Sequence, residues 1–308
     1  MHSALDGQQA RQTRSFCRAA AVCAGAAAGC EAAEILFRRL ALLLLSAWQA
    51  GAAAASASAY DSLRWALSLA AGSLALALPA ACVLRAQGRS PAGWLRRPRR
   101  GMTLPALGVY LGLSELCNLA AAYVGEKTGS EQSLELPQSG AALFWAFLAV
   151  CAAPPLLEEL FFRGVLQGTL RRYGAWAAIF CQAILFALLH GSAAAAFFAL
   201  PAGLFFGYLA ECSGSLLPGM LLHCLNNSIA FGFAVLRGGG LDALADALNR
   251  FGFFALPLVG AAALLYISRH ARQKFVRLMP GVSPLMLLRC PVWDITVAFL
   301  TLAIVWGW

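Results

Sequence analysis

The stretch PPLLEELFFRG, residues 154–164, places two adjacent carboxylates and an arginine within an otherwise apolar part of the chain. Ionisable side chains are costly in hydrocarbon and seldom persist there without a partner or a task. The double proline before them predicts a kink, because proline removes a helical hydrogen bond. Glu158, Glu159 and Arg163 are therefore the first candidates for a functional site.

The composition indicates a membrane protein. Of 308 residues, 60% are hydrophobic and 12% are charged, and the mean hydropathy is +0.70, whereas a soluble domain has about 25% charged residues. Apolar runs of about 20 residues, long enough to cross a bilayer, recur along the chain, and no strand-period alternation indicates a barrel. We expect an all-α polytopic membrane protein of about eight to nine transmembrane helices.

The apolar runs predict spans that cover approximately residues 40–59, 63–84, 104–124, 141–172, 176–190, 194–210, 216–236, 251–267 and 292–306. Before them, residues 1–39 form a predicted polar or amphipathic segment, loose over residues 1–15. Residues 16–30 are compatible with a cleaved signal peptide, although the charges that follow favour an interfacial helix. The remaining chain, 40–308, is predicted to be one transmembrane domain with its functional core at about 141–236.

The charges predict the orientation in the cell membrane. The basic clusters at residues 38–39, 85–100, 171–172 and 269–277 fall on one side of the alternating spans, and the acidic loop 125–139 falls on the other. Basic loops stay cytoplasmic, so the N-terminus is predicted to be inside and the C-terminus outside. The net charge of +9 follows from these loops, and we expect no nucleic-acid partner. The ten cysteines form no CxxC pair and predict neither a disulfide framework nor a zinc cluster.

Helical geometry separates the two glutamates. Residues four apart share a helix face, so Glu159 and Arg163 are predicted to form an ion pair. Glu158 is turned by about 100° from Glu159 and is free to face a cavity. A buried charge cluster that only fixes helix packing is the alternative, but one carboxylate would serve that purpose.

Two later stretches add further polar groups. FALLH, residues 186–190, ends a predicted span with His190, and HCLNN, residues 223–227, places His223 and Asn227 four residues apart on one face. Polar residues can also join membrane helices by hydrogen bonds. Together with Glu158, however, they provide a base to activate water and donors to stabilise an oxyanion.

In this order, EELFFR (158–163), FALLH and HCLNN resemble the EExxxR, FxxxH and HxxxN motifs of the CPBP intramembrane proteases. This family, also called Abi, includes CAAX prenyl endopeptidases and bacteriocin-processing enzymes. The resemblance implies a CAAX-protease-like helical bundle that hydrolyses a protein or peptide substrate at or in the lipid bilayer. It covers residues 141–236, and whether the substrate is a prenylated CAAX tail, a peptide leader or another segment stays open.

The resemblance also implies roles by position. Glu158 would be the catalytic base, His190 would position or deprotonate the water, and His223 and Asn227 would form the oxyanion hole. The residues that would hold the site together are Glu159, Arg163 and Phe186.

The family's use of a metal leaves two mechanisms open. Its members are commonly described as metalloproteases, while others resemble glutamate-dependent proteases that do not clearly need one. If a zinc ion binds, its ligands would be Glu158, His190 and His223, with the fourth position left for water.

Two points remain open from the sequence. A non-enzymatic scaffold or a proton-coupled transporter is the alternative function, with Glu115, Glu158 and the histidines as a proton relay. In addition, at 1.5 Å per residue, His223 would lie about 12 Å and His190 about 24 Å from the basic side. Straight helices would keep these histidines apart, so kinks and tilts must close the gap.

Overall fold

The computed structural model describes residues 2–51, 56–98, 103–130 and 134–270, together with residues 285, 290, 293 and 294. This part of the chain is helical and contains no strand. Seven of its helices are long and apolar enough to cross a membrane, and α7 (Ala175–Leu188) is a shorter apolar helix. The predicted class, an all-α polytopic membrane protein, is confirmed; the predicted last span, 292–306, lies almost wholly outside the described residues.

Six of the long helices are continuous α-helices: α1 (His2–Gly51), α2 (Ala57–Ala86), α3 (Thr103–Thr128), α8 (Ala193–Ser213), α9 (Leu217–Gly238) and α10 (Asp242–His270). The pass between residues 140 and 173 consists of α4 (Gly140–Phe147), η2 (Leu148–Ala152), α5 (Ala153–Glu158), η3 (Glu159–Gln167), α6 (Gly168–Leu170) and η4 (Arg171–Tyr173). A 3-10 turn, η1 (Pro91–Gly93), lies in the loop between α2 and α3.

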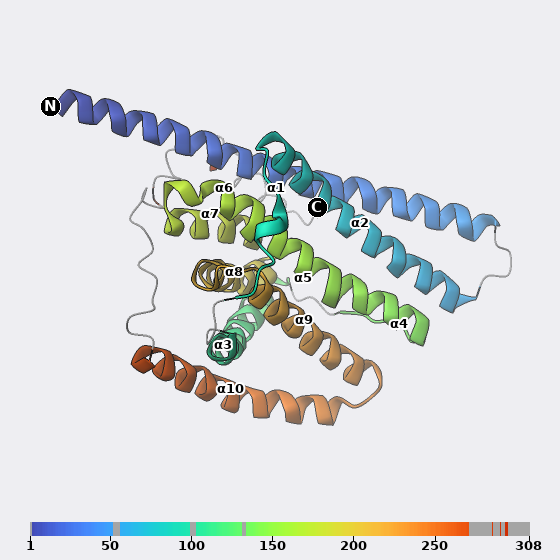
Figure 1. Ribbon diagram of the computed structural model, residues 1–308. Coiled ribbons are helices and arrows are strands. Elements are labelled where there is room, and N and C mark those ends of the chain that lie inside the picture. The colour runs from blue at the N-terminus through green and yellow to red at the C-terminus, as the bar shows by residue number, and fades with distance from the viewer. Residues whose placement is uncertain are drawn as a thin grey trace.

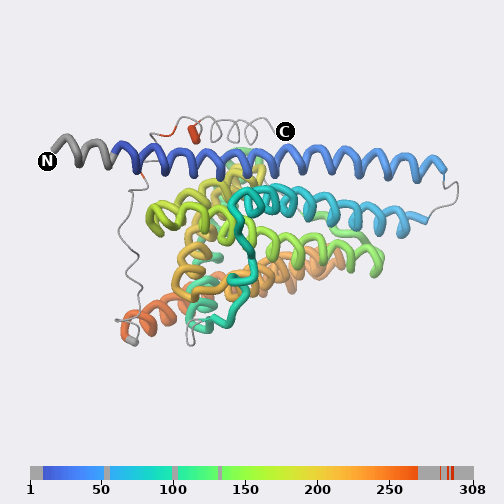
Figure 2. Tube along the Cα trace, turned by 45° about the horizontal axis from the view of Figure 1, so that its top comes forward, coloured from blue at the N-terminus to red at the C-terminus, as the bar shows by residue number. Residues whose placement is uncertain are grey.

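Helix α1 is continuous where the sequence predicted a loose end, an interfacial helix and a separate span from residue 40. It runs along one side of the bundle beside α2 (Figures 1 and 2). Phe16, Cys23 and Cys30 lie on a face of small residues and are buried against η3 and α7. This apolar face explains why α1 differs from the prediction: it packs in the core of the bundle and does not lie at the membrane–water interface.

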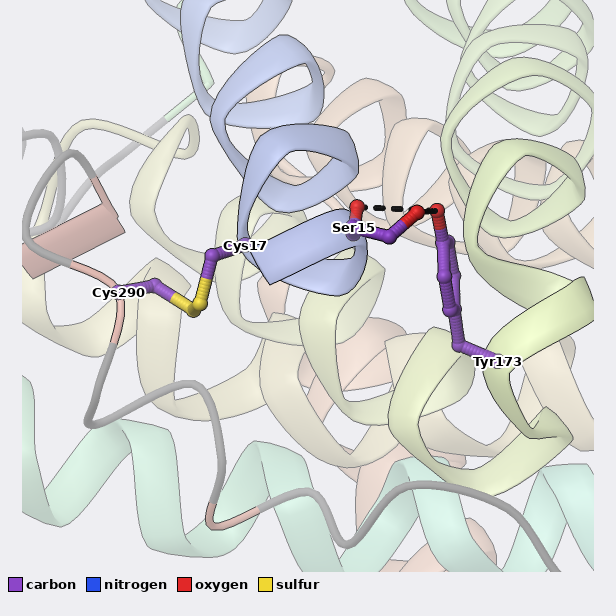
Figure 3. The surroundings of a disulfide bond; sticks show 4 residues. All are labelled: Ser15, Cys17, Tyr173 and Cys290. Carbon is purple, nitrogen blue, oxygen red and sulfur yellow. Dashed lines mark hydrogen bonds between the residues drawn. A yellow bond between two sulfur atoms is a disulfide. The ribbon is translucent and has the colours of Figure 1, made fainter. Parts of the chain in front are cut away.

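A disulfide fastens the start of α1 to a distant part of the chain. Cys17 is bonded to Cys290, 273 residues further on (Figure 3). Two residues before Cys17, the Tyr173 hydroxyl donates to the Ser15 carbonyl at 2.9 Å. The sequence predicted no disulfide framework; this single long-range bridge has no spacing signal that could indicate it. Both contacts join α1 to the end of the bundle that carries Arg171 and Arg172.

Glycines allow α3 and α10 to pack closely. A Cβ added to Gly112 would lie 2.8 Å from the Gly260 Cα, and one on Gly108 would lie 2.9 Å from the Ala263 Cβ. Small residues let membrane helices approach until their backbones touch. This contact holds α3, which forms one wall of the site, against α10.

The pass from residue 140 to 173 is not a plain α-helix. Its π-helical turns, η2 and η3, lie directly before and after the short helix that contains Pro154 and Pro155. Neither proline has an N–H, so the Val150 carbonyl has no donor four or five residues later. Such π-helical turns are frequent at functional sites, and here they set the direction of Glu158 and Glu159.

Candidate active site

Glu158 and Glu159 have different surroundings, as their helical spacing predicts. Glu159 is buried, with 1% of its side chain exposed, and its Oε1 lies 3.1 Å from Nη1 of the equally buried Arg163. Glu158 has 20% of its side chain exposed and lines a cavity. The predicted ion pair is therefore present, and the second carboxylate faces open space.

Aromatic rings surround the buried guanidinium of Arg163. Its Cζ lies 4.4 Å from the centroid of Phe186, 5.4 Å from that of Phe206 and 5.8 Å from that of Phe162. Ring faces attract a cation, and more strongly where water is excluded. Within the described residues, the Arg163 nitrogens make no aligned hydrogen bond. The aromatic cage therefore compensates for the buried charge.

His223 lies between the two glutamates. Its Nδ1 is 3.4 Å from Oε1 of Glu159, and its Nε2 is 3.6 Å from Oε2 of Glu158. The imidazole stacks on Phe206, with ring centroids 5.4 Å apart, and meets the edge of Phe186 at 6.0 Å. The ring is thus held by packing and connects the buried ion pair with the exposed carboxylate.

His190 follows the end of α7 and is oriented by the main chain. Its Nδ1 lies 2.7 Å from the Phe186 carbonyl. Because a carbonyl oxygen can only accept, Nδ1 carries the proton of this bond, and Nε2 of the neutral ring keeps its lone pair. The His190 ring contacts Phe186 edge to face at 4.6 Å. Phe186 therefore touches Arg163 and both histidines.

Asn227 lies one turn beyond His223 on α9. Its side-chain amide donates to the Val150 carbonyl at 2.9 Å, which is the group that the two prolines leave without a helical donor. Its neighbour Asn226 donates to the Asn227 Oδ1 at 3.4 Å. One N–H of the Asn227 amide is therefore bonded to the main chain, and the second can donate to a ligand.

All four candidate catalytic residues line one cavity of about 620 Å³. It lies between α3, α8 and α9, and its wall includes Glu158, His190, His223 and Asn227. Straight helices would have placed His190 and His223 at different depths in the membrane. In the structure they lie close together, since both rings contact Phe186.

The loop after α2 connects the two halves of the site. Arg89 donates to the carbonyl of Gly164 and the hydroxyl of Thr169, both at 3.1 Å, and the Trp94 ring packs on Gly164. The Trp94 carbonyl accepts from the amide of Leu216 at 2.9 Å, directly before α9. The loop thus fixes η3, which carries Arg163, relative to the helix that carries His223.

Sequence reasoning did not select four polar residues of this cavity: Tyr110, Asn118, Ser192 and Asn226. Tyr110 is 2% exposed, and its hydroxyl has no hydrogen-bond partner within the described residues. A polar residue within an apolar span was the sequence signal that could have indicated them, and Asn118 and Asn226 both show it. Glu115, which the transporter alternative needs, is not among the residues that line the cavity.

The side chains do not form a metal centre as they are placed. In the described parts of the chain, no group of three or more His, Cys, Asp or Glu residues is arranged to hold a metal ion. Glu158, His190 and His223 share the cavity, and the bond of His190 Nδ1 to a carbonyl leaves Nε2 as its only possible ligand atom. As they are placed, the three residues do not make up the zinc site that the sequence left open, and we derive no step through a metal.

Comparison with known proteins finds one family to which part of this chain is similar. Residues 140–229 match the family model described as Rce1-like, type II CAAX prenyl endopeptidase. The matched residues include all three motifs, and the resemblance to the CPBP and CAAX proteases is confirmed. No curated protein and no solved structure matches the chain.

Proposed function

We propose that this multi-pass membrane protein is an intramembrane endopeptidase in which Glu158 activates the attacking water. The observation that carries the proposal is the position of Glu158: it is the partly exposed member of a buried charge cluster and shares a cavity with two histidines. The family match supports a hydrolase of the CAAX type that acts on peptides at the membrane.

The first step begins with a water held between Glu158 and Nε2 of His190. The Glu158 carboxylate accepts one proton of the water while its oxygen attacks the carbonyl carbon of the scissile peptide bond. The Nε2 lone pair of His190 accepts the second O–H as a hydrogen bond and so orients the water. The π electrons of the carbonyl move to its oxygen, and a tetrahedral oxyanion forms.

The oxyanion then needs donors that are fixed before it forms. The free N–H of Asn227 is one donor, and Nε2 of His223 is the other when both ring nitrogens carry a proton, since Nδ1 faces the Glu159 carboxylate and the ring stacks on Phe206. When the C–N bond breaks, the proton on Glu158 passes to the leaving nitrogen. The products are a carboxylic acid and an amine, and Glu158 returns to its ionised form.

The test compares Glu158→Gln with Glu115→Gln in purified protein. Both substitutions remove a carboxylate from an apolar span, but Glu115 does not line the site. We expect Glu158→Gln to lower kcat by at least about 100-fold, the range of general-base catalysis, and Glu115→Gln to leave it within about twofold. The readout is cleavage of a peptide ending in a CAAX sequence, with and without a prenyl group. Retained cleavage in Glu158→Gln would overturn the proposal, and loss in Glu115→Gln would favour a proton relay.

The metal question needs a separate experiment. We expect cleavage to survive extended treatment with a chelator, because no group of side chains among the residues that the structure describes is arranged as a metal centre. Activity that is lost with the chelator and restored by zinc alone would contradict the metal-free mechanism. Peptides that accumulate in cells carrying Glu158→Gln would identify the natural substrate.

A further inference from the structure

A second, smaller cavity of about 240 Å³ also reaches the proposed catalytic base. It lies between α1, α2 and the pass that contains α5, whereas the larger cavity lies between α3, α8 and α9. In Figure 1, α1 and α2 lie on one side of α5, and α3 and α8 lie on the other. The two cavities share Glu158, Phe186 and His190, so these side chains form the wall between them.

The smaller cavity contains polar side chains among its apolar lining residues. Glu34 and Arg38 of α1 form an ion pair at 2.6 Å, and both line it together with Ser68 of α2. Charged side chains within a membrane helix are almost always directed to a partner or to a water-filled space. A water molecule occupies about 30 Å³ in the liquid and needs polar partners. The cavity has room for several waters, and its polar side chains can bond them.

Hydrolysis in a membrane requires a path for water. One water is consumed in each turnover, and hydrocarbon excludes it. A peptide bound in the larger cavity would cover the face of Glu158 on that side and block the entry of water there. The smaller cavity approaches the same carboxylate and His190 from the other set of helices.

We propose that the smaller cavity is the water entrance of the active site. Water enters between α1 and α2, is held by the Glu34–Arg38 pair and Ser68, and reaches Glu158 behind the bound peptide. This inference rests on the proposed function, since it assigns the source of the water that Glu158 activates.

Gly72 of α2 offers a way to close the entrance. It lines the smaller cavity, and a Cβ placed on it would meet no other atom within 4 Å. Gly72→Ala should therefore narrow the cavity without displacing a neighbour, and Gly72→Phe should fill it. The matched control is Gly25→Phe on α1, where a Cβ also meets nothing within 4 Å and which lines neither cavity.

We expect Gly72→Phe to lower kcat about tenfold or more with KM within about twofold, because it limits water and leaves peptide binding intact. Gly72→Ala should have an intermediate kcat, and Gly25→Phe should behave as wild type. If Gly72→Phe does not fold, Ser68→Leu tests the same entrance from its rim. An unchanged kcat in the folded variant would overturn the inference. A raised KM or an altered cleavage site would also overturn it, because the cavity would then hold part of the peptide.

The same assay separates this inference from the proposed function. If Glu158→Gln is inactive but Gly72→Phe cleaves at the normal rate, only the water entrance is wrong. If Glu158→Gln retains activity, the proposed function fails first.

Discussion

Asn227 donates a hydrogen bond from its side-chain amide to the main-chain oxygen of Val150, at 2.9 Å. The α-helical donor for that oxygen would be residue 154 and the π-helical donor residue 155, and both are prolines. The polar residue on α9 therefore replaces a hydrogen bond that the site helix cannot make for itself. This contact ties the position of Asn227 in the cavity to the kink that directs Glu158.

We predict that Asn227→Ala lowers the free energy of unfolding by about 1–3 kcal/mol, because it leaves the partly buried Val150 carbonyl unpaired. Pro154→Ala restores an N–H four residues after Val150, so the double variant should regain part of this loss. Unfolding in detergent, followed in all four members of the double-mutant cycle, measures the coupling. Strictly additive effects would show that the two sites are independent.

The two adjacent glutamates should differ in their effects on stability. Glu159→Gln leaves the buried Arg163 charge without its partner and should cost about 3–5 kcal/mol. Glu158→Gln, at a partly exposed position, should change the free energy of unfolding by no more than about 1 kcal/mol while abolishing cleavage. Thermal unfolding of both variants in one detergent compares them directly. Equal losses would contradict the division of roles between the two carboxylates.

Much of this division could be predicted from the sequence. The spacing of Glu159 and Arg163 predicted their ion pair, and the 100° turn predicted that Glu158 would face elsewhere. Their polar character within apolar spans likewise indicated His190, His223 and Asn227. These signals are local, since each depends on residues within one or two helical turns.

The long-range features had no such signal. Nothing in the spacing of Cys17 indicates a partner 273 residues away, and the alanine-rich face of α1 was compatible with both an interface and a core. The pairing of Asn227 with Val150 also depends on how two separate helices cross. Such contacts are decided by tertiary packing, which single-sequence patterns do not determine.

Gly219 provides a test of the contact between α9 and the buried pair. A Cβ on this residue would lie 2.9 Å from Oε2 of Glu159. We predict that Gly219→Ala shifts this carboxylate, which also faces His223, and lowers kcat about tenfold with a smaller effect on KM. Gly232→Ala on the same helix is the control, since its Cβ meets nothing within 4 Å. Similar losses in both variants would point to a general effect on α9.

The orientation prediction can be tested together with the disulfide. Basic loops predict that the end of the bundle with Arg171 and Arg172 is cytoplasmic, and the contact of Ser15 with Tyr173 places Cys17 at this end. The cytosol keeps thiols reduced. The state of the Cys17–Cys290 bond in intact cells therefore reports the orientation: it should be reduced if this end is cytoplasmic and oxidised if the orientation is the reverse.

Two measurements check this prediction. An epitope tag in the loop after α3 should be accessible on intact cells, whereas one in the loop after α2 should need permeabilisation. A maleimide mass shift, compared between wild type and Cys17→Ser in rapidly quenched cells, reports the thiols. If Cys17 is oxidised and the loop after α2 is accessible from outside, the orientation is the reverse, and the larger cavity would receive its peptide from the opposite side of the membrane.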